Sequence, residues 1–520
     1  MINGYLIALY VFIAYVLLLI VLWRSGLASR LKLGLLGPLV MVRTQRGITV
    51  LKHLSRARRF WRGFAVFSRI VFIAGMVGML ALLIWEAILV ISVPRVSAPS
   101  LQSYLLLPGI NPYVPLWYGL LGIIVAVVLH EMAHGVLSEA QDIDVQSMGV
   151  LLLVVPVGAF VEPDQKQLES VEPSKRVRVF GVGPGTNMIL ALLFFLLFIG
   201  PFLGAASPVH QGLTIVSIPG GSPAAREGLA QWDELLSVNG TPVTDASSLN
   251  SMQGLLPGHD YNGVVLHNGK EVNVHLVAGV VIVGIISGSP AASAGVRSGW
   301  IIAKMNGTTV MNEVQLSALF NSTVPNEKVP FVFVEGNGSV ISMNITLSSV
   351  AAVEHTPSST HPIGFLGVYL AYMGIEAIPM SSLLGLLRNP LYSATTPSST
   401  FTSLLDFVVQ PFEGLSPIPS GLAANLLAYG TTQSSLFWIG ANISYWIFWI
   451  NLWVGLFNML PAIPLDGGYL FRDNLTLLLR RIMGKNSEGQ RERIARSVTT
   501  FFSFLVFFLI LWQFAAIRLI

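Results

Sequence analysis

The sequence predicts a polytopic α-helical membrane protein, with about six membrane spans, into which two small α/β modules are inserted. Of its 520 residues, 53% are hydrophobic and 11% are charged, whereas soluble domains contain about 25% charged residues. Several apolar segments reach the roughly 20 residues that a helix needs to cross a bilayer. A region rich in Gly, Ser and Asn, with a repeated motif, separates the fourth apolar segment from the fifth. The chain has no cysteine, so no disulfide braces that region.

The apolar segments predict six spans, each read from its own run of hydrophobic residues. They lie at about 5–23, 68–93, 115–139, 187–204, 437–461 and 499–518. No basic residues precede the first segment and no A-x-A cleavage site follows it. We therefore interpret it as a retained helix and not as a removed signal peptide.

Basic residues predict the orientation of these spans. Between Arg24 and Arg69 the chain has eleven Lys or Arg residues and no Asp or Glu. The positive-inside rule places this segment in the cytoplasm and the N-terminus outside. A basic segment can instead bind nucleic acid, but the two flanking spans favour the topological interpretation, and we expect no nucleic-acid partner. Alternation then places 140–186 and 462–498 inside and 205–436 outside.

Two further observations concern charge. Seven Lys or Arg residues between Arg472 and Arg496 agree with a cytoplasmic location of that loop. Within the second span, Arg69 can snorkel to the membrane surface. Glu86 lies deeper, and we interpret it as a structural polar contact and not as part of a water-lined pathway.

The region from about 211 to 348 contains an internal repeat. The sequence GSPAA at Gly221–Ala225 returns at Gly288–Ala292, an offset of 67 residues. Without a gap, Asn239-Gly240 then matches Asn306-Gly307. A match at a fixed period indicates a duplicated module. Each copy is expected to form a short capped helix and an apolar strand that ends in an Asn-Gly turn.

This repeated pattern resembles PDZ domains of the type found in bacterial proteases. The resemblance implies two PDZ-like modules, at 208–278 and 279–348. A generic β-rich external domain is the alternative. Residues 349–436 contain Ser- and Thr-rich tracts and short apolar runs, and we expect a connecting segment outside the membrane or on its surface, with a lid or gate as the alternative.

A motif typical of zinc sites ends the third span. His130, Glu131 and His134 belong to the sequence HEMAH. Two histidines four residues apart share one face of a helix and can hold one Zn²⁺, and the glutamate can take a proton from zinc-bound water. Ionisable residues inside a bilayer mark a functional site by default. A pair of core histidines is the bland alternative.

Asp466 is the best candidate for a third ligand. Two histidines leave a catalytic tetrahedral zinc one protein ligand short. Asp466 follows two prolines at the end of the fifth span. The predicted topology puts it at the same cytoplasmic depth as His130 and His134. Taken alone, an aspartate before two glycines is more often a helix cap or a turn residue.

Together, the HExxH motif and N-x-x-P-x-x-P-x-D-G, from Asn458 to Gly467, resemble the site-2 protease family of intramembrane zinc metalloproteases, peptidase family M50. PDZ-like modules between the two motifs strengthen the resemblance. It implies an N-terminal two-helix extension at 1–114 and a protease core in two halves, at 115–207 and 437–520. Between the halves lie the two modules, at 208–278 and 279–348, and the linker at 349–436.

The resemblance also implies roles for individual residues. His130, His134 and Asp466 would be the Zn²⁺ ligands and Glu131 the general base. Asn187 ends the sequence GPGTN, which resembles the family's G-P-x-x-N, and Asn458 begins the second motif. Asn187 would then donate a hydrogen bond to the substrate or the oxyanion, and Asn458 would support the substrate or the zinc shell. Helix caps or interhelical hydrogen bonds would explain both asparagines equally well.

The resemblance further suggests a re-entrant β-hairpin between Gly149 and Glu162, whose edge could pair with an unwound substrate. A buried amphiphilic loop is the alternative. The expected activity is cleavage of transmembrane protein substrates in or near their membrane segments, with the modules outside the cell membrane screening or binding substrate. The expected active site faces the cytoplasm. Two alternatives are a membrane zincin with a glutamate as third ligand and a catalytically inactive PDZ scaffold in the bilayer.

Overall fold

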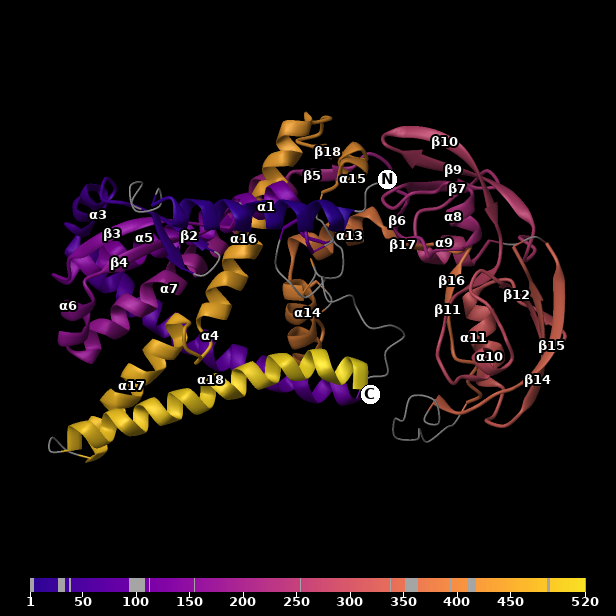
Figure 1. Cartoon of the computed structure of the whole chain (residues 1–520). Coiled ribbons are helices and arrows are strands. Elements are labelled where there is room, and N and C mark those ends of the chain that lie inside the picture. Colours follow the sequence, from indigo (N-terminus) through magenta and orange to yellow (C-terminus); the bar gives the residue numbers. More distant parts are fainter. Residues whose placement is uncertain are drawn as a thin grey trace. The chain divides into compact units, whose positions relative to one another are not determined.

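The protein was analysed as a computed structural model, in which the chain separates into two compact units. The structure describes residues 4–26, 33–36, 39–92, 108–111, 113–153, 155–252, 254–336, 338–350, 363–392, 394–409, 411, 418–483 and 487–519. We call one unit the helical unit; it comprises Met1–Val90, Leu101–Leu197 and Ile443–Ile520. The other, the β unit, comprises Ile91–Ser100 and Phe198–Asn442. Figure 1 shows the elements of each.

Long apolar helices dominate the helical unit. Among the described residues, five helices are long and apolar enough to cross a membrane. They are α4 (Arg58–Ser92), α5 (Leu116–Ala140), α7 (Pro173–Leu197, continued by the π-helical turn η2, Phe198–Gly204), α16 (Ser435–Asn458) and α18 (Glu488–Leu519). The polytopic architecture predicted from the sequence is therefore confirmed. The span expected at 5–23 lies in α1 (Gly4–Arg24) and stays a prediction.

The helical unit also contains one antiparallel sheet with the strand order β1-β2-β3-β4. Strands β3 (Val145–Leu153) and β4 (Val155–Pro163) form a hairpin at the position where one was expected. Strands β1 (Leu33–Leu36) and β2 (Leu39–Thr44) come from the basic segment, where the sequence suggested no strands, and β2 pairs with β3. Of the two edges of the hairpin, the edge of β3 is therefore covered, while β4 pairs with β3 alone among the described strands.

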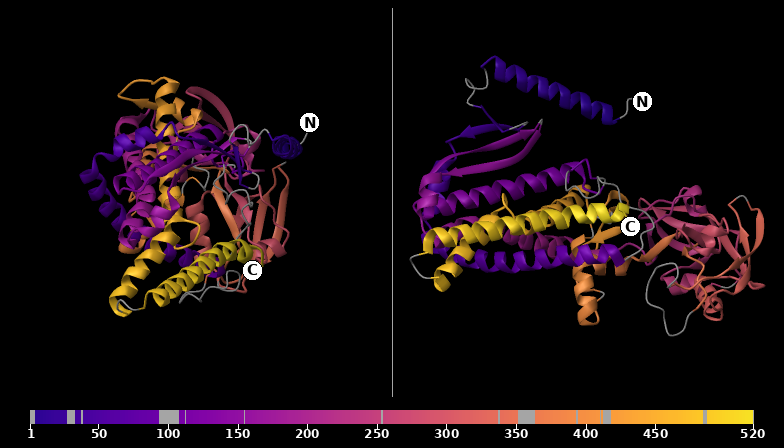
Figure 2. Two further views of the ribbon diagram at one scale, coloured as in Figure 1. Left: turned by 60° about the vertical axis from the view of Figure 1, so that its left-hand side comes forward. Right: turned by 60° about the horizontal axis from the view of Figure 1, so that its bottom comes forward.

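The sheet packs beside α5 (Figure 2), and an ion pair joins two of its strands. Arg43 on β2 donates to both carboxylate oxygens of Glu162 on β4, over 3.1 and 3.2 Å. This arginine holds the pKa of Glu162 below its usual range. Helix α3 (Ile48–Ser55) buries Leu51 against Val136 of α5 and Val145 of β3. The short α6 (Gln165–Ser170) and the amphipathic α17 (Asp466–Met483) complete the unit.

The β unit is built around two six-stranded sheets of the same topology. One has the order β10-β9-β7-β6-β17 and the other β15-β14-β12-β11-β16, with β8 and β13 each paired at the side. The first sheet contains β6 (Leu213–Ser217), β7 (Glu234–Val238), β8 (Thr241–Pro242), β9 (Asp260–His267), β10 (Lys270–Val277) and β17 (Glu376–Pro379). The second contains β11 (Val280–Ile285), β12 (Ile301–Met305), β13 (Thr308–Thr309), β14 (Lys328–Val334), β15 (Val340–Thr346) and β16 (Val368–Tyr372).

The sequence repeat corresponds to a structural repeat. In each copy a serine, Ser222 or Ser289, caps a short helix, α8 (Pro223–Arg226) or α10 (Pro290–Ser293). The two Asn-Gly turns have left-handed asparagines, with φ of 51° at both Asn239 and Asn306. A longer helix follows in each copy, α9 (Ala246–Asn250) or α11 (Glu313–Asn321).

Each repeat is completed by a strand from the segment that the sequence suggested was a linker. Strand β16 pairs with β11 and β17 pairs with β6. The second sheet is thus nested within the first along the chain, and the expected boundaries 208–278 and 279–348 leave out one strand of each sheet. A single apolar core runs through both repeats. The remaining elements are β5 (Ala206–Pro208), paired with β18 (Leu426–Ala428), and helices α13 (Met380–Arg388), α14 (Pro397–Val409) and α15 (Ser420–Ala424).

Candidate metal centre

Helix α5 brings two histidines to one point. His130 and His134 are separated by one helical turn, and their Nε2 atoms lie 3.1 Å apart. Both side chains are buried, with 5% and 8% of their surface exposed. Both histidines therefore lie on one face of α5, as the spacing of the motif predicted.

Asp466, the first residue of α17, completes the group. Its Oδ2 lies 3.0 Å from Nε2 of His130 and 3.2 Å from Nε2 of His134. Ligands bound tetrahedrally at about 2.0–2.1 Å from zinc lie about 3.3 Å from one another. Among the described residues these three form a group that could hold a metal ion, with Asp466 and not a glutamate as its third member.

The hydrogen bonding of His134 leaves its Nε2 free to bind a metal. Nδ1 of His134 lies 2.7 Å from the carbonyl oxygen of Val179, and because a carbonyl only accepts, Nδ1 carries a proton. In a neutral His134 the lone pair of Nε2 then lies beside the carboxylate of Asp466, where both groups can bind the same cation. The donor set therefore fits a divalent metal, with Val179 orienting the ring as an outer partner.

Glycines let the helices approach this closely. A Cβ on Gly183 of α7 would lie 2.3 Å from Nε2 of His134 and 2.7 Å from Nε2 of His130. At the start of α17, a Cβ on Gly467 would lie 2.0 Å from the carbonyl oxygen of Leu460. Sequence reasoning noticed Gly183 only as part of GPGTN and missed its contact with the histidines. The signal available was a glycine directly before a proline inside an apolar helix.

Glu131 lies beside the histidines on α5 and is partly buried. Its Oε2 accepts a hydrogen bond of 3.1 Å from the backbone N–H of Val161 on β4. The carboxylate therefore connects the histidine motif to the edge strand of the hairpin. It lies on the same cavity as His130, His134 and Asp466.

The two asparagines differ in their surroundings. Asn458 lines the cavity, and its Nδ2 donates to the carbonyl of Val454 over 3.0 Å. Asn187 is fully buried, and neither atom of its amide has a hydrogen-bond partner among the described residues. It lies one turn after Gly183 on α7. Buried polar atoms are nearly always hydrogen-bonded, so the amide of Asn187 has the capacity to bind a further group that the described residues do not supply.

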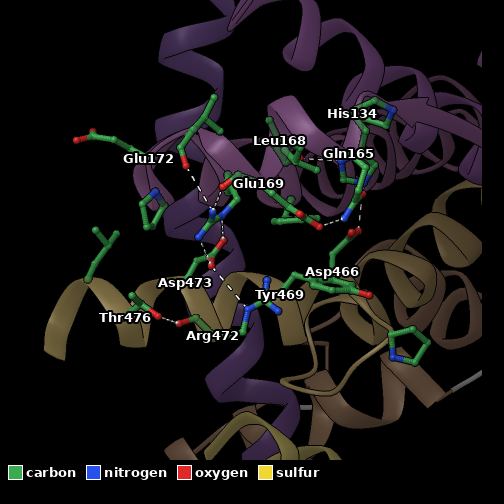
Figure 3. A pocket seen from close by; sticks show the side chains of 18 of the residues that line it. His134, Gln165, Leu168, Glu169, Glu172, Asp466, Tyr469, Arg472, Asp473 and Thr476 are labelled. Carbon is green, nitrogen blue, oxygen red and sulfur yellow. Dashed lines mark hydrogen bonds and ion pairs between the residues drawn. The ribbon is translucent and has the colours of Figure 1, made fainter. Parts of the chain in front are cut away.

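A cavity of about 1230 Å³ extends from the metal group to charged side chains on α6, α7, α17 and α18. Figure 3 shows the part of its lining that includes His134, Asp466 and Asp473. Polar walls let water enter. Its charged residues away from the metal group are Glu169, Glu172, Arg176, Arg472, Asp473, Arg480, Glu488, Arg491, Glu492 and Arg496. These residues lie in segments where the sequence suggested a cytoplasmic location.

The sequence profile of peptidase family M50 matches residues 118–506 of this chain. Among curated proteins, an uncharacterised protein of Methanocaldococcus jannaschii is 24% identical over 240 residues, which are 46% of this chain and 62% of that protein. Zinc metalloprotease Rip1 of Mycobacterium tuberculosis is 27% identical over 206 residues, 35% of this chain and 46% of its own. The membrane-bound transcription factor site-2 protease homolog of Arabidopsis thaliana is 26% identical over 141 residues, 27% of each chain.

The aligned regions therefore span less than two thirds of the length of each of these relatives. The family profile covers a larger part, from the start of α5 into α18, and so includes the histidine motif, Asp466 and the β unit between them. With three quarters of its length inside that match, the chain belongs to peptidase family M50.

Proposed function

We propose that this protein is an intramembrane zinc metalloprotease of the site-2 protease type, with His130, His134 and Asp466 as the zinc ligands. One observation carries the proposal: three metal-binding atoms from two distant helices converge in the buried part of a polar cavity, with Glu131 beside them. The names of the M. tuberculosis and A. thaliana relatives support zinc and proteolysis.

Zinc held by these residues would lower the pKa of a bound water toward about 7 and polarise the scissile carbonyl. Glu131 then takes the proton of the attacking water and passes it to the leaving amine. Asn458, which lines the same cavity, and Asn187, with its unpartnered amide, are the side chains available to donate hydrogen bonds to the substrate backbone or the developing oxyanion.

The substrate must be extended at the cut, because the backbone of a helix is hydrogen-bonded to itself and shielded from attack. Strand β4 offers the edge for an extended segment, since β2 covers the opposite edge of the hairpin. The hydrogen bond from Val161 to Glu131 puts this edge beside the general base. Transmembrane proteins whose helices contain helix-breaking residues near the scissile bond are therefore the substrates we infer.

The direct test is to measure zinc content and cleavage with purified full-length protein and single-pass substrates in liposomes. Glu131→Gln is expected to retain zinc and to lower the cleavage rate by about 10²- to 10⁴-fold, the usual contribution of a general base. Asp466→Asn is expected to lose zinc as well as activity. Equal cleavage by the wild type and Glu131→Gln would refute the mechanism and would favour an inactive scaffold.

Sidedness can be tested without background labelling, because the chain has no cysteine. Lys52→Cys lies in the basic segment and Lys270→Cys in the first repeat, and both side chains are exposed. We infer a cytoplasmic location for the first and an extracytoplasmic one for the second. A membrane-impermeant maleimide applied to intact cells should label Lys270→Cys alone, and the reverse pattern would contradict the proposed topology.

The repeats are proposed to be PDZ-like modules that bind or screen substrates. Strands β16 and β17 are sheet edges among the described strands, and an exposed edge can add a peptide strand. Deleting 208–348 alone would leave these two strands behind, so the deletion should extend to residue 379. Loss of discrimination between substrates with large and small ectodomains is expected, and unchanged selectivity would exclude the screening role.

A further inference from the structure

A buried ion pair joins α7 to α17 away from the metal group. Nε of Arg176 donates to Oδ2 of Asp473 over 2.9 Å, and Nη2 donates to Oδ1 over 3.1 Å. Only 1% of Asp473 is exposed. Such a two-pronged contact fixes the angle between its partners as well as their distance.

Arg176 uses its remaining donors to hold the connection between α6 and α7. Its Nη1 donates to the carbonyl oxygens of Glu169, over 3.0 Å, and Val171, over 3.4 Å. The guanidinium is therefore immobilised by backbone on one side and presents a fixed fork to Asp473 on the other. A lysine has no such planar fork and could not reproduce both contacts.

A second arginine holds the next residue of α17. Nη2 of Arg69, on α4, donates to Oδ1 of Asn474 over 2.6 Å. The amide of Asn474 donates in turn to the carbonyl of Leu470 over 3.0 Å. Successive residues of α17 are thus bound to two different helices, which restricts both its rotation and its sliding along its axis.

The ion pair and the metal group lie on the same interface in matching register. Asp473 follows Asp466 by seven residues on α17, and Arg176 precedes Gly183, which touches both histidines, by seven on α7. Seven residues are close to two helical turns, so each pair shares one helix face about 10 Å apart along the axis. Figure 3 shows Asp466 and Asp473 on the same side of α17.

We infer that Arg176 and Asp473 are positioning residues that set the reach of Asp466 toward His130 and His134; this inference rests on the proposed function. Asp466 is the first residue of α17, and the turn before it is held by its own backbone hydrogen bonds, so a contact further along the helix is needed to fix the direction of the helix axis. The ion pair fixes the helix two turns further on. Arg69 assists by holding the same turn of α17 from α4.

The test uses full-length protein and measures zinc affinity by chelator competition, together with kcat and KM for a single-pass substrate. Arg176→Gln and Asp473→Asn are each expected to lower zinc affinity by about 10- to 100-fold, a loss on the scale seen when the orientation of a metal ligand is no longer supported, and to lower kcat more than they raise KM. Arg176→Lys should fall between these variants and the wild type. Arg178→Gln, two residues away on α7, is the matched control and should stay within about twofold of the wild type.

Zinc affinity within about twofold of the wild type in both folded single variants would overturn the inference. Should a single variant unfold because a buried charge has lost its partner, the double variant Arg176→Met with Asp473→Leu replaces the pair by packed apolar groups. Weak zinc binding by the folded double variant supports the positioning role, and wild-type zinc binding overturns it. Absence of zinc from the wild-type protein, or full activity of Glu131→Gln, would instead refute the proposed function.

Discussion

Among the described residues, buried polar atoms without a hydrogen-bond partner are more frequent in the helical unit than in the β unit. In the β unit, Asp233 accepts from the backbone of Ala230 and from His267, and Ser222 and Ser289 cap helices. In the helical unit, Nε2 of His130, Nε2 of His134 and Oδ2 of Asp466 converge within 3.2 Å of one another, and Nδ1 of His130 has no hydrogen-bond partner among the described residues. Buried groups are normally satisfied because an unmet partner costs about 1–3 kcal/mol.

This difference separates a unit arranged for stability from one arranged for chemistry. Unmet polar groups persist where a ligand, metal or substrate supplies the missing partner. The buried ion pair of Arg176 and Asp473 shows that the helical unit can satisfy its charges where no chemistry is required. The comparison predicts that small changes near the metal group abolish function, whereas changes in the β unit alter stability and leave metal binding intact.

The largest effect is expected from Gly183→Ala. The added methyl group would lie 2.3 Å from Nε2 of His134, inside the space that the metal and its ligands need. We expect zinc loss and a fall in cleavage rate of at least about 100-fold, since displacement of a catalytic group by 1 Å costs about that much. Zinc content and cleavage of purified protein check this prediction.

Gly181→Ala is the matched control for that prediction. It lies on the same helix, and its added Cβ would approach only the side-chain end of Leu470, at 3.3 Å. We expect near wild-type zinc content. Equal zinc content in the two alanine variants would contradict the claim that α7 closes directly on the histidines.

A smaller effect is expected in the β unit at Glu234, which has a buried carboxyl group. Oε1 accepts from the N–H of Gly212 over 2.8 Å, while Oε2 has no partner among the described residues. Burial raises the pKa of Glu234 from an ordinary value of 4.5 to about 7. Below pH 4.5 the carboxyl group of Glu234 is protonated in both the folded and the unfolded state. Between pH 4.5 and about 7 it is ionised only in the unfolded state.

The free energy of unfolding of the β unit should therefore fall by up to about 3 kcal/mol as pH rises from 4.5 to about 7. Above that pH it should stay level. Glu234→Gln should remove this dependence and make the unit more stable than the wild type at pH 8. Urea unfolding of the β unit, followed by pulse proteolysis of the full-length protein at pH 5 and pH 8, measures both quantities. A wild-type midpoint that does not change with pH would show that this carboxyl is ionised in the fold.

The sequence predicted those parts of the protein that local rules dictate. His130 and His134 share a face as soon as the HEMAH segment is helical. Membrane spans are predicted from the length of an apolar segment alone. Asp466 was predicted because a catalytic zinc needs a third protein ligand, and the structure places its carboxylate beside both histidines. The repeat was visible because identical residues recur at a fixed offset.

What the sequence did not predict depends on pairing between distant segments. Strands β1 and β2 are short apolar runs in a basic segment; they pair with each other, and β2 pairs with β3, which lies more than one hundred residues later. Strands β16 and β17 lie in a region that resembled a linker, and each joins the first strand of a repeat. Strands of four to six residues carry too little pattern to be separated from loops. The contact of Arg176 with Asp473 likewise follows from helix register and not from any motif.

Two glycines in equivalent positions, Gly367 and Gly374, allow the two repeats to be compared directly. Gly367 and Gly374 have φ of +79° and +71°, and each touches the serine that caps the short helix of its repeat. In the left-handed region an alanine costs about 1–2 kcal/mol. A Cβ on Gly367 would lie 2.2 Å from Cβ of Ser289, whereas one on Gly374 would lie 2.9 Å from Cβ of Ser222. Gly367→Ala should therefore destabilise its sheet more than Gly374→Ala.

Hydrogen exchange of β11 and β6 in the full-length protein measures the two effects separately. Gly220→Ala is the control, because its added Cβ meets no atom within 4 Å. Zinc content should stay at the wild-type level in all three variants. Zinc loss in Gly367→Ala would show that the β unit governs the metal group, against the division of roles between the units.

The smallest effect is expected from Arg43→Gln, the exposed counterpart of the Arg176 pair. Arg43 and Glu162 are each 41% exposed, so water screens their attraction and replaces lost hydrogen bonds. We expect zinc affinity and kcat of Arg43→Gln to stay within about twofold of the wild type. This is expected even though Arg43–Glu162, like Arg176–Asp473, is a bidentate contact between an arginine and a carboxylate. Since the pKa of Glu162 is lowered by Arg43, any stabilisation from the pair should be lost as pH falls through that lowered pKa. A loss of activity as large as that of Arg176→Gln would mean that the sheet, and not the register of α17, positions the active site.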